Sequence, residues 1–109
     1  MKRTIALVVT LGFSSVMVAT AADVKENWDK NCAKCHGAEG KGDAPMGKKL
    51  SVKDMTDAKV QADLKDDAAF KIIKEGVKEG DSTKMKAFAD TLSDDEIKAL
   101  VQKVRSFKK

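Results

Sequence analysis

The residues with the clearest chemical potential are Cys32, Cys35 and His36, which stand together in the run Cys32-Ala33-Lys34-Cys35-His36. They are the only two cysteines and the only histidine among the 109 residues. Two thiols three residues apart lie on adjacent edges of one helical turn and can add to the two vinyl groups of a haem, while the next residue presents an imidazole to the iron. The spacing therefore predicts one covalently attached haem c.

Other chemistries explain the same three residues less well. A disulfide between Cys32 and Cys35 would close so short a loop that it would constrain little of the unfolded chain. A thioredoxin-like redox pair needs a βαβ framework, which this sequence does not predict. Structural zinc sites usually take four protein ligands, and two thiolates with one imidazole supply only three. A surface histidine without a role is the remaining alternative, and the position of His36 directly after the second cysteine argues against it.

The amino terminus has the pattern of a signal peptide. Met1-Lys2-Arg3 is a short cationic opening, residues 4–18 are uncharged and mostly apolar, and Ala19-Thr20-Ala21 is a small-x-small cleavage signature. The apolar run is shorter than the about 20 residues that span a bilayer comfortably. We therefore expect residues 1–21 to be a cleavable signal, and residues 22–109 to be a periplasmic or otherwise exported domain without a membrane span. An uncleaved anchor is the alternative.

Size and charge narrow the class of this exported part. Residues 22–109 leave room for one small domain, which often depends on a disulfide, a metal or a cofactor for stability. Removal of Lys2 and Arg3 from the 21 basic residues leaves 19, against 17 Asp and Glu. A balance so close to neutral argues against nucleic acid as a partner.

The elements that must position the motif are predicted to be helical. Between Asp23 and Cys35, apolar side chains recur at i, i+4 and i+8, at Val24, Trp28 and Cys32. The glycines and the proline of residues 37–45 then predict an ordered loop.

Further helices are predicted in the second half of the chain. A short one is expected within residues 56–65, and a firmer one over residues 67–75 with Gly76 as its stop. Ser93-Asp94-Asp95-Glu96 fits a capping box that begins the last helix. Its apolar stripe is Ile97, Leu100, Val101, Val104 and Phe107. The sequence thus predicts an all-α fold of three to four helices packed around one haem.

On these motifs the chain resembles the class I cytochromes c over nearly all of residues 22–109. Cys32 to Gly37 matches the attachment motif of that family, and Gly40-Lys41-Gly42 is similar to its glycine loop. Lys84-Met85-Lys86-Ala87-Phe88 resembles its methionine loop, and the run from Leu92 to Phe107 its final helix. The resemblance implies the small cytochrome c fold, with a late methionine capping the iron.

Two positions depart from the family's pattern. Family members often place proline directly after the ligand methionine, where this chain has Lys86. They place in the final helix an aromatic residue that crosses over the first helix, where this chain has Lys103. We expect Trp28, together with Phe107, to fill the gap at this crossing.

The single histidine limits the second axial ligand to methionine, lysine, water or nothing. Met85, 49 positions after His36 in a segment expected to be irregular, is the predicted ligand. Met46 and Met55 compete with it, the first too near His36 in the loop and the second expected to pack before a helix. The resemblance also implies that the backbone carbonyl of Pro45 accepts the free N–H of the iron-bound imidazole. The alternative is that Pro45 only stiffens the loop.

These inferences predict a single-electron carrier rather than an enzyme, because a histidine-methionine haem has no open position for a substrate. We expect a monomer with redox proteins as partners. Lysines in segments that would border the haem could steer an acidic docking surface, or could be ordinary solvated lysines; they are Lys34, Lys41, Lys48, Lys49, Lys84 and Lys86. Two other classes are a sensor or peroxidase-like protein with a vacant sixth position, and a subunit of a larger respiratory complex.

Overall fold

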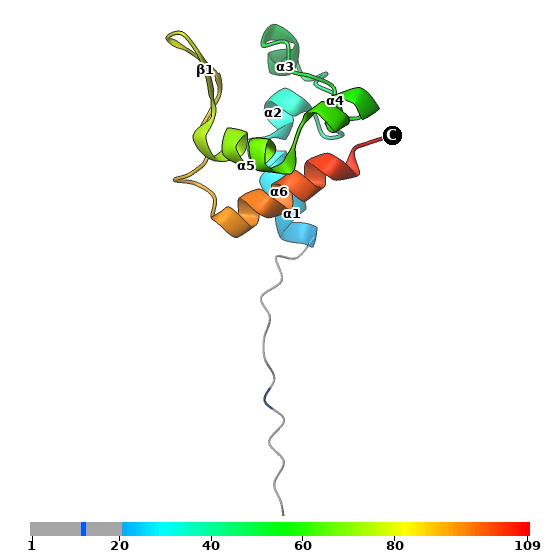
Figure 1. The fold of residues 1–109 in the computed structure, drawn as a ribbon, viewed down its shortest axis with the longest axis vertical. Coiled ribbons are helices and arrows are strands. Elements are labelled where there is room, and N and C mark those ends of the chain that lie inside the picture. The colour runs from blue at the N-terminus through cyan, green and yellow to red at the C-terminus, as the bar shows by residue number, and fades with distance from the viewer. Residues whose placement is uncertain (1–11, 13–20) are drawn as a thin grey trace, which may run out of the picture.

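The protein is described by a computed structural model that covers Gly12 and residues 21–109. The predicted signal peptide therefore lies outside the described residues, apart from Gly12 and Ala21. The described part forms six helices and one antiparallel pair of strands (Figure 1). The helices are α1 (Ala21–Asn31), α2 (Ala33–His36), α3 (Pro45–Lys49), α4 (Ala58–Asp63), α5 (Asp66–Glu75) and α6 (Asp94–Ser106), and the strands are β1 (Val77–Glu79) and β2 (Ser82–Met85).

The mostly helical architecture agrees with the sequence, whereas the expected count of three to four helices and the purely helical class need correction. α3 begins at Pro45, the last residue of the expected ordered loop, because proline is well suited to the first turn of a helix. β1 and β2 pair as a hairpin with Gly80 in its turn. Of the strand residues only Met85 is even partly buried, so no alternation of apolar and polar residues marks these strands in the sequence.

The core lies where α6 crosses α1 and packs along α5 (Figure 1). The predicted apolar stripe is buried there except for Phe107, which follows α6 and is partly buried, and Ile97 and Leu100 are completely covered. The predicted capping box begins this helix, with the Ser93 hydroxyl accepting from the Glu96 N–H and the Glu96 carboxylate accepting from the Ser93 N–H. Two aromatic rings meet at the crossing, as expected: the centroids of Trp28 and Phe107 are 4.9 Å apart.

The glycine-rich stretch after α2 is an ordered loop, as predicted. The Gly42 N–H donates to the His36 carbonyl at 2.8 Å, and the Met55 N–H donates to the Gly40 carbonyl at 2.7 Å. Gly40 has a φ of 73°, and a Cβ there would lie 2.6 Å from the Phe107 ring. A glycine is therefore required at this position both by the backbone and by the neighbouring ring.

No helix in the described part of the chain is both long enough and apolar enough to cross a membrane.

Candidate cofactor site

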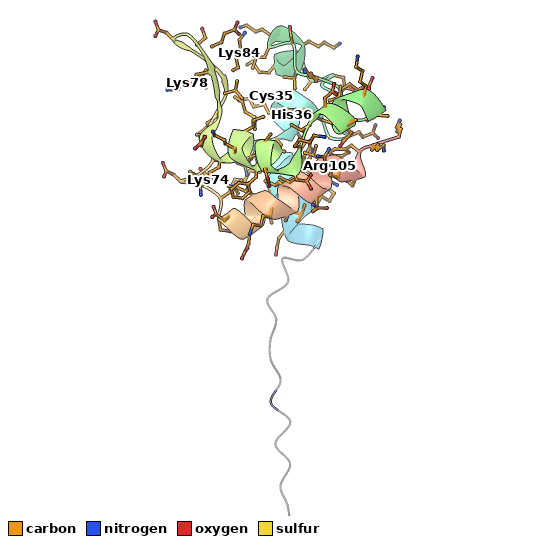
Figure 2. The ribbon with its side chains drawn as sticks, viewed as in Figure 1. Cys35, His36, Lys74, Lys78, Lys84 and Arg105 are labelled. Atoms are coloured by element: carbon orange, nitrogen blue, oxygen red, sulfur yellow. The ribbon has the colours of Figure 1, made fainter. Side chains whose placement is uncertain are left out.

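Cys32, His36 and Met85 come together in the folded chain although Met85 is far from the other two in sequence. All three line an outer hollow of about 610 Å³, which Cys35 also lines and which is bounded by α2, residues 50–53 and the hairpin. The same three residues line a smaller hollow of about 90 Å³. Figure 2 shows Cys35 and His36 on α2, which lies between the hairpin and α4 in this view.

Cys32 lies in the short break between α1 and α2, and Cys35 lies within α2. The Cys32 N–H donates to the Trp28 carbonyl, and the His36 N–H donates to the Cys32 carbonyl, each at 2.9 Å. Both thiols are free, so the alternative of a disulfide is not formed. Burial, and then the neighbouring Cys35, raises the pKa of Cys32 to about 12, which leaves this thiol neutral.

The indole ring of Trp28 packs beside the imidazole of His36. The ring centroids of the two residues are 5.8 Å apart, and the indole Nε1 donates to the carbonyl of Gly37 at 3.0 Å. Burial lowers the pKa of His36, which favours the neutral imidazole, the form that binds metals. Among the described side chains, its Nδ1 is a buried polar atom without a hydrogen-bond partner.

The predicted hydrogen bond from His36 to the carbonyl of Pro45 is therefore not formed in this structure. Pro45 is instead the first residue of α3. On either side of it, the carbonyl of Ala44 accepts from the Lys48 N–H and the carbonyl of Met46 accepts from the Leu50 N–H. Its role toward a ligated imidazole stays a prediction.

Gly47 holds α3 against the attachment segment and was missed by the sequence reasoning. A Cβ at this position would lie 1.9 Å from the carbonyl oxygen of Cys35 and 3.0 Å from that of Gly42. α3 packs on α2 through this close approach. The only signal in the sequence was a glycine two residues after Pro45, in what looked like a loop.

The three methionines considered as iron ligands take different positions. Met85 ends β2, opposite Val77, and lines both hollows. Its expected setting in an irregular segment is thus wrong, since it belongs to a paired strand. Met55 lines only the smaller hollow, and Met46 is 39% exposed on α3.

Backbone hydrogen bonds anchor the base of the hairpin beside this site. After β2 the chain returns to α5, where the Phe88 N–H donates to the Ile73 carbonyl at 3.0 Å. The Ala89 N–H donates to the Lys74 carbonyl at 3.1 Å. At the start of the hairpin, a Cβ on Gly76 would lie 2.5 Å from the Met85 carbonyl oxygen, so glycine permits the close approach of the two strands.

The side chains that line the smaller hollow have the chemistry to contact a flat apolar group that carries a metal. Apart from His36 and Cys32 its lining is apolar, and comprises Trp28, Met55, Leu64, Ala69, Ile72, Ile73, Met85, Leu100 and Val104. The part of the chain that the structure describes holds no cluster of three His, Cys, Asp or Glu side chains suited to a metal ion. A haem matches these donors, because it brings its own four nitrogen ligands and needs only axial groups and thiols from the protein.

The rim of the outer hollow is basic. Its lining includes five lysines and no carboxylate; the lysines are Lys30, Lys34, Lys53, Lys84 and Lys86. Lys34, Lys84 and Lys86 were expected near the site, whereas Lys30 and Lys53 were not. Of the other expected lysines, Lys48 and Lys49 lie on α3, and Lys41 pairs with Glu39 at 2.9 Å.

Comparisons with known proteins agree with this geometry. A family described as cytochrome c oxidase, cbb3-type, subunit III matches residues 19–102. The chain belongs to this family of c-type cytochromes. The cytochrome is 35% identical over 108 residues to cytochrome c-553 of Helicobacter pylori (strain ATCC 700392 / 26695), a match that covers 99% of this chain and 100% of the relative.

Solved structures show the same fold. The KustC0563 c-type cytochrome superposes on this cytochrome with a TM-score of 0.70 at 34% identity, over 78% of this chain and 96% of the other. A mutant of that protein gives a TM-score of 0.69 at 34% identity, over 79% and 99% of the two chains. The resemblance to small class I cytochromes c is thereby confirmed, and family membership implies a covalently bound haem c with its iron.

Proposed function

We propose that this cytochrome is an exported carrier of single electrons, with one haem c bound through Cys32 and Cys35 and ligated by His36 and Met85. One observation carries the proposal: Cys32, His36 and Met85 line the same two hollows, and Cys35 lines the outer one. The full-length similarity to a cytochrome c-553 supports a carrier.

Each residue has a distinct part in this proposal. When bound, the haem supplies a one-electron couple of its iron. Cys32 and Cys35 hold the group covalently, so that it stays with the protein through repeated cycles. His36 and Met85 would both ligate the iron, which would leave it no position for a substrate, and thioether sulfur would favour the ferrous state. The apolar walls keep water from the iron and raise the potential further.

The unpartnered Nδ1 of His36 supports a further role for Pro45. A ligated imidazole usually donates its second N–H to an acceptor that fixes the orientation of the ring. In the loaded protein we expect the carbonyl of Pro45 to supply this acceptor, through a small shift of α3. The shift would remove the single unsatisfied buried side-chain atom found in the described part of the chain.

The basic rim of the outer hollow supports redox proteins with acidic docking surfaces as partners. Lys30 comes from α1, Lys34 from α2 and Lys84 from β2, and Lys53 and Lys86 come from the segments after α3 and β2. The Lys84 side chain also pairs with Glu79 at 3.4 Å. Screening shortens electrostatic reach to about 8 Å at physiological ionic strength, so the association rate should fall as salt rises. A rate independent of salt would leave these lysines as ordinary solvated side chains.

The description of the matching family favours a second candidate, a subunit of a terminal oxidase. The two candidates differ in size in the cell: a carrier is a free monomer, exported with loss of residues 1–21, and a subunit copurifies with a larger membrane complex. Gel filtration of the native protein from periplasmic and membrane fractions separates them.

Expression with the native amino terminus in a host that matures c-type cytochromes tests the main proposal. We expect the purified protein to begin at Ala22, to retain one haem mass after denaturation, and to titrate reversibly as a one-electron couple. A ferric sulfur-to-iron charge-transfer band should be present. Peroxide turnover, or a high-spin spectrum without this band, would favour the sensor or peroxidase class instead.

A further inference from the structure

The side chain of Gln61 forms hydrogen bonds that link α4 to α6 and to the segment before α4. Gln61 is the only buried residue of this helix and is 4% exposed. Its amide nitrogen donates to the carbonyls of Met55 at 2.6 Å and Val104 at 2.7 Å. Its Oε1 accepts from Nη1 of Arg105 at 2.9 Å. Both amide hydrogens and the amide oxygen therefore have partners, as a buried amide requires.

Arg105 of α6, which Figure 2 shows beside α4, makes further hydrogen bonds to this segment. We call Gln61, Arg105 and their hydrogen bonds the Gln61–Arg105 joint. Its Nη1 also donates to the Gln61 carbonyl at 2.7 Å, and its Nη2 donates to the Leu64 carbonyl. Its Nε donates to the Asp66 carboxylate at 2.8 Å. A guanidinium presents its donors as a rigid planar fork, so one side chain reaches several acceptors that a lysine ammonium would not reach together.

The segment held by this joint forms part of the wall of the smaller hollow. Met55 and Leu64 line that hollow together with His36 and Met85. Both residues are only partly buried against the core, and α4 brings no fully buried apolar side chain of its own. Backbone bonds hold the start of this wall, from Met55 to the Gly40 carbonyl and from Lys109 to the Thr56 carbonyl, and hydrogen bonds of Gln61 and Arg105 hold the rest of it.

We propose that Gln61 and Arg105 are positioning residues that keep residues 55–66 closed over the smaller hollow and exclude water from His36 and Met85. The effect at the iron rests on the proposed function. Water near a haem stabilises its more highly charged ferric state, so opening of this cover lowers the reduction potential. The joint thus adjusts the potential without contacting the iron.

Two variants of the haem-loaded protein test the joint. Gln61→Leu removes the amide at similar volume, and Arg105→Lys keeps the charge but loses the fork; Gln102→Leu, at an exposed glutamine of α6, is the matched control. Hydrogen exchange at the amides of Gln61 and Leu64 should be roughly tenfold faster in both variants, relative to the amide of Ile97 at the start of α6. The midpoint potential should fall in both variants and stay constant in the control.

Three results would overturn the proposal. The first is unchanged hydrogen exchange at the α4 amides, and the second is equally faster exchange at Ile97, which would indicate a global loss of stability. The third is faster exchange at the α4 amides with an unchanged midpoint potential. If Gln61→Leu does not fold, Arg105→Lys still decides the question. A parent protein without covalent haem would refute the proposed function instead, and the exchange experiment would still show whether the joint holds α4.

Discussion

The two sides of the site are built in different ways. On the attachment side, both cysteines and His36 lie within about one helical turn, supported by the buried Trp28 and by α3 through Gly47. On the other side, Met85 ends a hairpin whose remaining strand residues are all exposed. The first side is fixed by local sequence and close packing, and the second by one strand pair and its anchor on α5. We therefore expect changes on the attachment side to cost the cofactor or the fold, and changes on the hairpin side to alter only the iron's environment.

The largest effect is expected from Cys32→Ala combined with Cys35→Ala. Loss of both thiols should abolish covalent haem, and a small domain without this addition to its core should lose most of its cooperative folding. Mass spectrometry after denaturation and circular dichroism measure the two effects. Met46→Ala, at an exposed methionine, is the control. A double variant that still melted cooperatively with native helix content would show that the apolar core suffices without the cofactor.

Met85→Ala should have the next largest effect, confined to the iron. Covalent haem should remain because Cys32, Cys35 and His36 are intact, but the charge-transfer band should vanish, carbon monoxide or cyanide should bind, and the potential should fall. Met55→Ala should keep the band and cost a few kcal/mol of stability at most. Loss of the band in Met55→Ala, with retention in Met85→Ala, would reverse the ligand assignment.

A pair of glycine substitutions compares the two sides directly. In Gly47→Ala the new Cβ would meet the Cys35 carbonyl, so we expect a loss of about 1–3 kcal/mol as α3 is pushed from α2. In Gly80→Asn the side chain enters open space at a φ of 61°, which asparagine tolerates, so the loss should be below about 1 kcal/mol. Urea unfolding of the two loaded variants measures the difference. Equal losses would mean that the attachment side is no more tightly packed than the hairpin.

The smallest effect concerns acid stability at the start of α6. The Ser93 N–H, then Asn27 and the Ser93 hydroxyl, bond to Glu96 and hold the pKa of its carboxyl below the ordinary 4.5. A lowered pKa in the folded state stabilises the fold above pH 4.5, and this contribution is lost as the pH falls through the folded-state pKa.

Glu96→Gln keeps a side chain that suits the capping box but removes the titration. We expect this variant to lose less thermal stability than the parent between pH 5 and pH 3, as seen in melting curves. Asp95→Asn, at a side chain that makes neither hydrogen bond of the capping box, is the control and should follow the parent. If Glu96→Gln and the parent had the same acid dependence, Glu96 would not contribute to it.

The sequence by itself determined the attachment chemistry and most of the helices. Cys32, Cys35 and His36 are local, so a helical turn is enough to bring them together, and the capping box at Ser93 and the stripe of α6 are local signals as well. α3 and the hairpin escaped prediction because their residues are mostly exposed and carry no apolar periodicity.

The tertiary structure decided how residues distant in sequence reach the attachment motif. Met85 reaches the hollow because β2 pairs with β1 and because the chain after β2 forms backbone hydrogen bonds with α5. No residue spacing in the sequence predicts these hydrogen bonds. Gly47 matters only because the backbone of α2 lies against it. The two residues of the Gln61–Arg105 joint are 44 positions apart in the sequence. They meet because the packing of α6 in the core brings both polar side chains together away from water, and a buried polar group needs a hydrogen-bond partner.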